Sequence, residues 1–336
     1  MAFRWRKAIG FTLLGFVLLI AVGLFASGFW RAFVGPKARA VTSRTFESTP
    51  VRLERGKYLA ENVMGCFYCH SDRDWKAEGT PPIEARKGAG TAFFGGPGKI
   101  FAPNITPDRE TGVGAWSDDE LARAIREGVS RDGHALFPIM PYMNYRQLSD
   151  EDTASVIAYL RSIPAVKNTV EKSKLDFPLN FLVNLMPNPL ETAVPAADVS
   201  TPVKRGELLA TLGSCADCHT PMEKGQPIPG LTLAGGFTLN EPSGETTAPN
   251  ITPDASGISY YDEALFLEVM RTGQVKTRKL NPTMPWALYG KMTDDDLKAL
   301  FAYLKTVPAV SHKVDNTEPP TPCKVCKGRH GFGDRN

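Results

Sequence analysis

The sequence predicts a mainly α-helical protein in which two tandem domains follow an N-terminal transmembrane helix. Three observations lead to this fold class. An apolar run lies near the start of the chain, residues 51–310 present the same motifs twice in the same order, and each repeat carries helix-start and helix-stop signals. The 30 glycines and 27 prolines among 336 residues favour loop-rich domains around a cofactor over long helical bundles.

The predicted transmembrane helix is an apolar run of residues 8–30, preceded by Arg4, Arg6 and Lys7 and ended by Arg31. At about 1.5 Å per residue, such a run crosses the roughly 30 Å hydrocarbon core of a bilayer. The basic residues before it predict a cytoplasmic N-terminus. A cleaved signal peptide is the alternative, although the run is long for one and no clear cleavage site follows. We therefore expect a single-pass protein of the bacterial inner membrane, with its domains in the periplasm.

The chain is predicted to contain five parts. They are a cytoplasmic N-terminus with the anchor (1–35), a first domain (50–166), a linker (167–202), a second domain (203–311) and a tail (312–336). Residues 177–186 of the linker are apolar but too few to span a membrane. They form either a strap packed across the two domains or a docking surface for a partner subunit or the bilayer.

Each domain is expected to contain three main helices. In the first domain they lie near residues 53–63, from a capping box at 117–120 to Gly128, and from residues 149–152 to just before Pro164. The matching signals of the second domain place one helix at residues 262–272 and another from residues 293–296 to just before Pro308. The last helix of each domain starts with a capping box, at 149–152 and at 293–296, in which aspartate replaces glutamate. Glycines on the first helices allow close contact with the last ones, and the expected pairs are Gly56 with Tyr159 and Gly206 with Tyr303.

Each repeat carries two cysteines three positions apart, followed directly by a histidine. This is the attachment pattern of c-type haem, in which the thiols add to the haem vinyl groups and the imidazole becomes the proximal iron ligand. Two copies inside aligned repeats predict two covalently bound haem c groups. The residues are Cys66, Cys69 and His70 in the first domain, and Cys215, Cys218 and His219 in the second.

Met140 and Met284 are the predicted second iron ligands, because they lie at equivalent places and each precedes a proline that stiffens the loop. Ordinary core packing is the alternative role of a methionine. Met143 is a second choice, since Leu288 lies near the matching place in the other repeat. His134 has no counterpart there, so we interpret it as a surface or loop histidine.

Asn104 and Asn250 lie in one heptapeptide that occurs in both repeats, Ala-Pro-Asn-Ile-Thr-Pro-Asp. They could donate hydrogen bonds to the haem propionates, which need partners when buried, or they could fix a turn. The sequence favours neither role over the other.

The tail holds a third cysteine pair, Cys323 and Cys326, but Lys327 stands where a haem histidine would be. A zinc site needs four ligands, and we find only these two cysteines and His330. In an exported protein we therefore expect a disulfide or contact with a partner.

The composition argues against other function classes. The net charge of +3, with 22% charged residues, shows no concentrated basic stripe of the kind that binds nucleic acid. No glycine-rich phosphate motif follows a predicted strand.

Residues 55–310 resemble the cytochrome c subunits of bacterial membrane-bound alcohol and gluconate dehydrogenases. The shared motifs are Arg-Gly-x-Tyr-Leu, Cys-x-x-Cys-His, Asn-Ile-Thr-Pro-Asp, Gly-x-Gly-x-Trp-Ser-Asp-Asp-Glu, Asp-Gly, Met-Pro-Tyr and Ala-Tyr-Leu. The plan of each repeat is similar to class I cytochrome c, in which the first and last helices cross beside the haem. The resemblance implies a subunit that takes electrons from a periplasmic dehydrogenase and passes them to quinone or an oxidase. Those subunits usually carry three haems, whereas this chain has two haem motifs and an anchor.

We therefore predict a membrane-anchored dihaem cytochrome c that carries electrons from a dehydrogenase or quinol-side donor to an oxidase-side acceptor. The expected partners are a periplasmic or membrane dehydrogenase, a terminal oxidase or bc1-type complex, and the membrane, but no nucleic acid. No catalytic acid, base or nucleophile is expected. The alternative is a dihaem enzyme of the peroxidase or thiosulfate-oxidising type, which needs one iron without a methionine ligand. The two matched Met-Pro segments argue against it.

Overall fold

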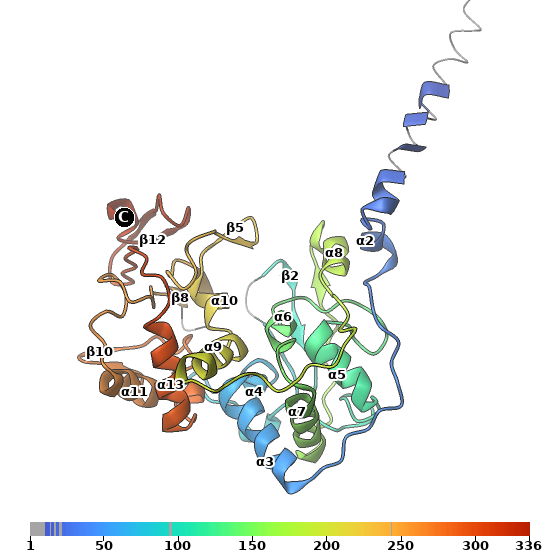
Figure 1. Ribbon diagram of the computed structural model, residues 1–336, viewed down its shortest axis with the longest axis horizontal. Helices are drawn as coiled ribbons and strands as arrows, with labels where there is room; N and C mark the ends of the chain where they lie inside the picture. Colours follow the sequence, from blue (N-terminus) through green and yellow to red (C-terminus); the bar gives the residue numbers. More distant parts are fainter. Residues whose placement is uncertain (1–10, 14, 17, 20–21, 94–95, 243) are drawn as a thin grey trace, which may run out of the picture.

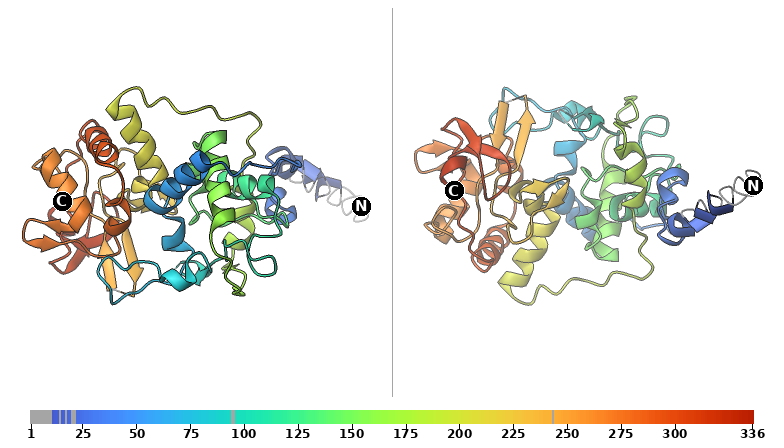
Figure 2. Two further views of the ribbon diagram at one scale, coloured as in Figure 1. Left: turned by 90° about the horizontal axis from the view of Figure 1, so that it is seen from below. Right: turned by 90° about the horizontal axis from the view of Figure 1, so that it is seen from above.

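Two domains of similar build lie side by side in the computed structural model, with the first domain on the right of Figure 1 and the second on the left. Figure 2 shows the same pair from two other sides. The structure describes residues 1–336 except 1–10, 14, 17, 20–21, 94–95 and 243. Several residues of the predicted anchor therefore lie outside the described part. Among the residues that are described, none of the helices combines the length and the apolar character that a membrane crossing requires.

Short helices joined by long loops make up both domains, as predicted. Those of the first domain are α3 (Pro50–Tyr58), its π-helical continuation η1 (Leu59–Val63), α4 (Cys66–Cys69), η2 (Glu84–Arg86), α5 (Asp118–Glu127), α6 (Tyr142–Tyr145) and α7 (Asp150–Ser162). Those of the second domain are α9 (Pro202–Leu212), α10 (Cys215–His219), α11 (Glu263–Thr272), α12 (Trp286–Tyr289) and α13 (Asp294–Leu304).

Side chains cap the starts of the six longest helices, but only one of the three predicted capping boxes is complete. Ser117 and Glu120 form the complete capping box before α5, and Gly128 ends that helix in the left-handed conformation. Before α7 and α13 only half of the predicted box forms, because the Asp152 carboxylate binds the guanidinium of Arg55 and the Asp296 carboxylate binds that of Arg205. Aspartate is one methylene shorter than glutamate, so its carboxylate does not reach back to the cap N–H.

The first and last helices of each domain cross at a glycine. A methyl group on Gly56 of α3 would lie 1.9 Å from the Ser155 carbonyl oxygen of α7 and 2.8 Å from the Tyr159 Cβ. On Gly206 of α9 it would lie 1.9 Å from the Ala299 carbonyl oxygen and 2.8 Å from the Tyr303 Cβ of α13. The two predicted helix pairs are therefore confirmed, and they fix the frame around each haem motif.

The strands are short antiparallel pairs in the loops. They are β1 (Thr91–Ala92) with β3 (Phe101–Ala102), β2 (Gly98–Lys99) with β4 (Lys174–Leu175), β5 (Met222–Glu223) with β6 (Gln226–Pro227), β7 (Thr238–Glu241) with β8 (Gly244–Thr247), β9 (Gln274–Val275) with β10 (Arg278–Lys279), and β11 (Pro320–Pro322) with β12 (Arg329–Gly331). A last 3₁₀ turn, η4, covers Gly333–Arg335.

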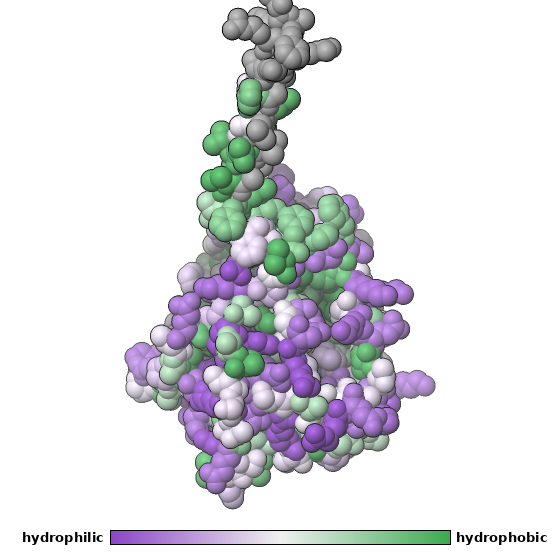
Figure 3. Space-filling model, turned by 90° about the vertical axis from the view of Figure 1, so that its right-hand side faces the viewer, coloured by the Kyte–Doolittle hydropathy of each residue, from purple (hydrophilic) through white to green (hydrophobic). Residues whose placement is uncertain are grey.

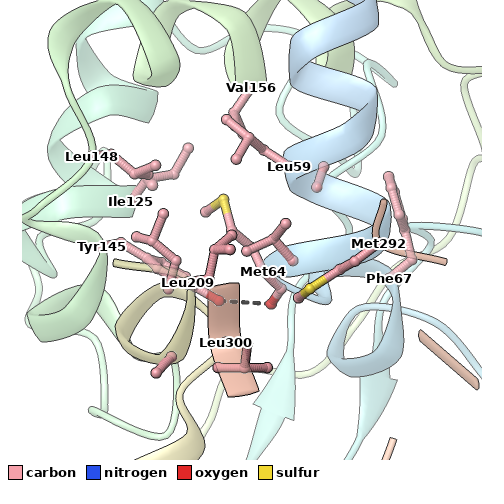
Figure 4. Packing of buried hydrophobic residues seen from close by; sticks show 14 of the residues in the cluster. Leu59, Met64, Phe67, Ile125, Tyr145, Leu148, Val156, Leu209, Met292 and Leu300 are labelled. Atoms are coloured by element: carbon pink, nitrogen blue, oxygen red, sulfur yellow. Dashed lines mark hydrogen bonds between the residues drawn. The ribbon is translucent and has the colours of Figure 1, made fainter. Parts of the chain in front are cut away.

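A single cluster of buried apolar side chains runs through both domains. Figure 4 shows Met64 and Val156 of the first domain in the same cluster as Leu209, Met292 and Leu300 of the second. The domains therefore share a core, which fixes the position of one haem motif relative to the other.

The linker packs on the first domain and on the N-terminal segment. Its helical turns α8 (Leu179–Leu182) and η3 (Val183–Leu185) contact α2 (Arg31–Val34), where the Asn184 side chain donates a 2.9 Å hydrogen bond to the Ala32 carbonyl. Further along, the Val194 carbonyl accepts a 2.9 Å hydrogen bond from the backbone N–H of Asp150 at the start of α7. The apolar segment thus packs on α2 and is not a strap across both domains.

Candidate haem-binding sites

Both Cys-x-x-Cys-His motifs form a single helical turn at the end of the first helix of their domain. The residue before each turn is left-handed, with φ of 64° at Gly65 and 55° at Ser214. Within such a turn, residues three apart lie on the same face, so both sulfurs of a motif are presented together. Burial, with a smaller contribution from the second cysteine of each motif, raises the pKa of Cys66 and Cys215 to about 12. An uncharged thioether suits such buried positions.

The two motif histidines are oriented by backbone carbonyls. The Nδ1 atom of His70 lies 2.8 Å from the Pro103 carbonyl oxygen, and that of His219 lies 2.7 Å from the Pro249 oxygen. A carbonyl only accepts, so Nδ1 carries the proton and Nε2 keeps the lone pair that binds iron. Burial lowers the pKa of both histidines, although the carbonyl contacts raise it, which favours the neutral imidazole that a metal ligand must be.

The repeated heptapeptide holds those carbonyls in place, and its asparagines fix a turn. Asn104 Oδ1 accepts hydrogen bonds from the backbone N–H and hydroxyl of Thr106 at 2.9 and 2.7 Å, and its Nδ2 donates to the Val166 carbonyl at 2.7 Å. Asn250 makes the same three bonds with Thr252 and Val310 at 2.8, 2.8 and 2.7 Å. Of the two roles that the sequence left open, the turn is the one that the structure shows.

Met140 and Met284 lie in equivalent turns, each partly buried against the common core. The backbone N–H two residues later donates back to the methionine carbonyl, at 2.7 Å from Tyr142 and at 2.8 Å from Trp286. Met143 is 57% exposed, whereas Leu288 is buried, so these two side chains do not have the same environment. This difference agrees with the preference for Met140, and the iron ligation by both methionines stays a prediction.

Several further groups around the motifs were not predicted. The Tyr145 hydroxyl donates to the Met64 carbonyl at 2.8 Å (Figure 4), and the Tyr289 hydroxyl donates to the Gly213 carbonyl at 2.6 Å. Each carbonyl lies two residues before the first haem cysteine. Both tyrosines follow their methionine by five residues, so the repeat alignment was a signal that could have found them.

The Tyr142 hydroxyl is buried and has no hydrogen-bond partner among the described residues. Tyr142 follows Met140 by two residues, and its ring packs against Gly128 at the end of α5, where an added Cβ would lie 2.5 Å from the ring.

Each motif region contacts the other domain across the interface. Asn144 of α6 donates to the Ser214 hydroxyl, just before the second motif, at 3.1 Å and to the Asp217 carboxylate, inside that motif, at 2.9 Å. In the opposite direction, a Cβ on Gly65 would lie 2.8 Å from a methyl carbon of Leu288 on α12. The turn that follows the Met-Pro pair of one domain, α6 or α12, therefore contacts the haem motif region of the other.

The remaining predicted residues lie elsewhere. His134 is an exposed loop histidine paired with Asp132, as expected. Cys323 and Cys326 are free cysteines in the tail, so of the two roles that we expected for them the disulfide is not formed, and contact with a partner stays a prediction. The estimate that only three zinc ligands are available was also wrong, because folding adds His312 to the group.

The paired thiols, the oriented and neutral imidazoles and the apolar surroundings together form a donor set that fits haem c at both places. Two such sites on two helical domains define a dihaem c-type cytochrome. When bound, haem c supplies one reversible electron per iron, while the chain's own residues hold the ring, orient the imidazole and exclude water.

Comparison with known proteins agrees with this class. The cytochrome c family model matches residues 53–164 and 203–308. The chain therefore belongs to the cytochrome c family, with two covalently bound haem c groups and electron transfer as its activity.

Individual relatives refine the comparison. The chain is 31% identical over 252 residues to a dihaem cytochrome c-type protein of Cereibacter sphaeroides, covering 73% of this chain and 83% of that protein. It is 27% identical over 320 residues to the cytochrome c subunit of the quinone-dependent alcohol dehydrogenase of Gluconobacter oxydans, and 29% identical over 281 residues to that of the gluconate 2-dehydrogenase of Pantoea cypripedii. These alignments cover 88% and 76% of this chain, but only 61% and 60% of the two subunits.

Proposed function

We propose that the protein is a membrane-anchored dihaem electron carrier of the bacterial periplasm, which accepts electrons from a dehydrogenase or quinol-side donor and delivers them to an oxidase-side acceptor. The observation that carries this proposal is that the α6 turn of the first domain and the α12 turn of the second each contact the haem motif region of the other domain, across a shared core. Asn144 of α6 donates hydrogen bonds to Ser214 and Asp217 of the second motif region. A short, rigid path between two redox centres is what a carrier needs.

In this proposal His70 and Met140 ligate the first iron, and His219 and Met284 ligate the second. Histidine with methionine raises the reduction potential and closes the coordination sphere, which suits electron transfer better than turnover of a small molecule. The equivalent turns at the two methionines and their partly buried positions support the assignment.

The anchoring proposal rests on the N-terminal segment. Described residues between 11 and 26 are helical, and their large apolar side chains are exposed, including Phe11 at 72%, Leu19 at 72% and Phe25 at 71%. Figure 3 shows apolar surface along this segment and where it meets the first domain. There Phe33 of α2 packs on Phe181 of α8, with ring centroids 5.4 Å apart, beside the exposed Phe177. Exposed apolar surface of this extent favours contact with lipid.

A dehydrogenase is the proposed electron donor, because two of the relatives are cytochrome c subunits of alcohol and gluconate dehydrogenases. The chain covers about 60% of those subunits, so the particular dehydrogenase, the quinone step and the oxidase-side acceptor are parts of the proposal. A bc1-type complex is the corresponding donor on the quinol side.

The first test is the visible spectrum of the ferric protein, with haem content per chain. Two haems and the weak far-red band of methionine sulfur on ferric iron, at full strength, are expected. Met140→Ala and Met284→Ala should each remove half of that band, whereas the neighbouring Met143→Ala should leave it unchanged. An unaltered band in either ligand variant would refute the assignment in that domain. A high-spin component in the unmutated protein would instead favour a dihaem enzyme, with peroxide as the first substrate to try.

Anchoring is tested by extraction. The full-length protein should sediment with membranes after an alkaline wash, and mild proteolysis near residues 35–49 should release a soluble fragment that carries both haems. A full-length protein that is soluble after export would contradict the anchor.

A further inference from the structure

Four side chains from the tail form a buried cluster on the second domain. His312, Cys323, Cys326 and His330 place one nitrogen or sulfur atom each within 4.8 Å of one another. Their exposed fractions are 0%, 5%, 2% and 1%. Apart from Gly331 and Gly333, they are the only buried residues between 312 and 336, all of which the structure describes. The tail therefore has almost no apolar core, and these four polar side chains occupy its centre.

The local fold brings the four together. Strands β11 and β12 form a hairpin in which Thr321 pairs with His330, and the cysteine pair occupies the connecting loop. The backbone N–H of Cys323 donates to the Gly328 carbonyl at 2.9 Å, and Lys327 is left-handed with φ of 60°. This turn directs both cysteines toward the same side as His330.

Hydrogen bonding fixes the state of the two imidazoles. Nδ1 of His312 lies 2.8 Å from the Ala234 carbonyl oxygen, and Nδ1 of His330 lies 2.9 Å from the Gly331 carbonyl oxygen. Since carbonyls only accept, both Nδ1 atoms carry the proton, and both Nε2 atoms are lone-pair acceptors. Yet these two Nε2 atoms are 3.1 Å apart, and the Cys323 sulfur lies 3.4 Å from the Nε2 atom of His312. Lone pairs at this distance repel each other unless a proton or a metal cation lies between them.

The spacing fits a small tetrahedral cation. With Zn–N near 2.0–2.1 Å and Zn–S near 2.3 Å, tetrahedral geometry places two nitrogens about 3.3 Å apart and a nitrogen about 3.6 Å from a sulfur. The observed separations of 3.1 and 3.4 Å are close to both values. Two thiolates also neutralise a divalent cation, so the complex would carry no net charge in a buried place.

We propose that His312, Cys323, Cys326 and His330 bind one structural Zn²⁺ ion in a closed S₂N₂ site. Both thiols lose their protons to solvent on binding, so one zinc replaces two protons and no electron is transferred. Two sulfur and two nitrogen ligands in tetrahedral geometry favour zinc over harder cations. Since all four positions are filled by protein, the ion has no open position for a substrate.

The ion would hold the tail against the loop that supports the second haem histidine. His312 reaches Ala234, whose neighbour Gly235 donates to the His219 carbonyl at 2.7 Å. A methyl group on Gly236 would lie 2.8 Å from the His312 ring and 3.2 Å from the Cys326 sulfur. The site therefore requires glycine here, which the sequence supplies.

The first domain contains a natural control for His312. Asn168 occupies the equivalent place, 144 residues earlier, as Met140 is 144 residues before Met284. Its side chain donates to the Ala89 carbonyl at 2.8 Å, and its backbone N–H donates to the Thr111 hydroxyl at 3.0 Å. His312 keeps both contacts, with Ala234 and with the Ser256 hydroxyl at 2.9 Å. His312→Asn should thus preserve the structural hydrogen bonds while removing only the zinc ligand.

The test is metal analysis of the purified full-length protein with both haems attached. We expect one zinc per two iron atoms after dialysis against a weak chelator, and zinc-edge X-ray absorption should show two sulfur and two nitrogen neighbours. His312→Asn and Cys323→Ser should reduce zinc to near zero per chain, while haem content and the far-red band remain. His134→Asn, on the exposed loop, should retain full zinc.

Three outcomes would overturn the proposal. One is an intact protein without zinc whose mass is lower by two hydrogens and whose tail cysteines resist alkylation, which indicates a disulfide. The second is zinc that His312→Asn retains at the level of the unmutated protein, which indicates binding elsewhere. The third is reduced, alkylatable cysteines with no zinc after zinc is supplied during folding. Because the readouts are zinc content and coordination, the result does not depend on the proposed redox partners.

Discussion

Replacing Gly56 with alanine tests the helix crossing that frames the first haem site. The new methyl group would lie 1.9 Å from the Ser155 carbonyl oxygen, where a normal contact is well above 3 Å. The obstacle is backbone on a packed helix, so α3 and α7 must separate by more than about 1 Å. Overpacking of this kind costs about 1–3 kcal/mol, and more where backbone must move.

Helix propensity alone predicts the opposite sign for this substitution. Glycine inside a helix is about 1 kcal/mol less favourable than alanine, so Gly56→Ala would stabilise an uncrowded α3. We expect packing to win, with a net loss of about 2 kcal/mol or more in the free energy of unfolding. The same loss is expected for Gly206→Ala, whose methyl would lie 1.9 Å from the Ala299 carbonyl oxygen.

Urea unfolding followed by haem absorbance is the assay, with the midpoint compared at unchanged slope. Lys57→Ala, at the next position of α3, is the control for ordinary surface change. A Gly56→Ala variant more stable than the unmutated protein would refute the close crossing.

Two further predictions concern hydrogen bonds that connect distant segments. Asn104→Ala should lower the free energy of unfolding by about 1–3 kcal/mol, because the Thr106 N–H and the Val166 carbonyl lose a buried partner. Urea unfolding measures this loss. An unchanged free energy of unfolding would mean that the turn forms without the side chain. Although burial raises the pKa of Asp119, hydrogen bonds from Arg39 and Thr42 hold this pKa below its usual value. Its contribution to stability should therefore be full above about pH 4, the unfolded value, and be lost as the pH falls through the lower folded value. Unfolding measured from pH 2 to 6 should show this slope, and Asp119→Asn should flatten it; an unchanged slope in the variant would contradict the reasoning.

Much of the domain frame followed from local rules. The Ser117 cap, the Gly128 stop and the crossings at Gly56 and Gly206 depend on residues a few positions apart or on the absence of a side chain, and the repeat provided each signal twice. Asp152 shows where such rules end. Its position predicts a capping box, but the crossing of α3 and α7 brings Arg55 within 2.8 Å, and the ion pair forms instead.

The relation between the two domains could not be predicted in the same way. Asn144 binds Asp217 of the second motif because α6 of the first domain packs against that motif, and nothing near either residue in the sequence specifies the contact. The repeat alignment could have identified Tyr145 and Tyr289 as equivalent residues. Their role, a hydrogen bond to the Met64 or Gly213 carbonyl just before a haem motif, is seen only in the structure.

His312 was missed because zinc ligands were sought close to the cysteine pair. It lies eleven residues before Cys323, in a segment that the repeat assigns to the support of Asn250. The informative signal was a difference within the repeat, since asparagine at position 168 becomes histidine at 312 just where a cysteine pair follows. A change of residue type between aligned repeats can therefore mark a function that one copy has acquired.

The difference between the domains also explains why a metal would be useful in the second one. After α7 the chain pairs β4 with β2, so the segment beyond Asn168 is held by backbone hydrogen bonds to its own domain. After α13 the strands β11 and β12 pair with each other, and the tail bonds to its own domain through side chains such as Asn316, which binds the Thr247 backbone. A unit of this size cannot bury enough apolar surface to hold its shape, and small units of this kind depend on disulfides or metals. A zinc ion between His312 and the hairpin would supply that missing stability at the loop that positions His219.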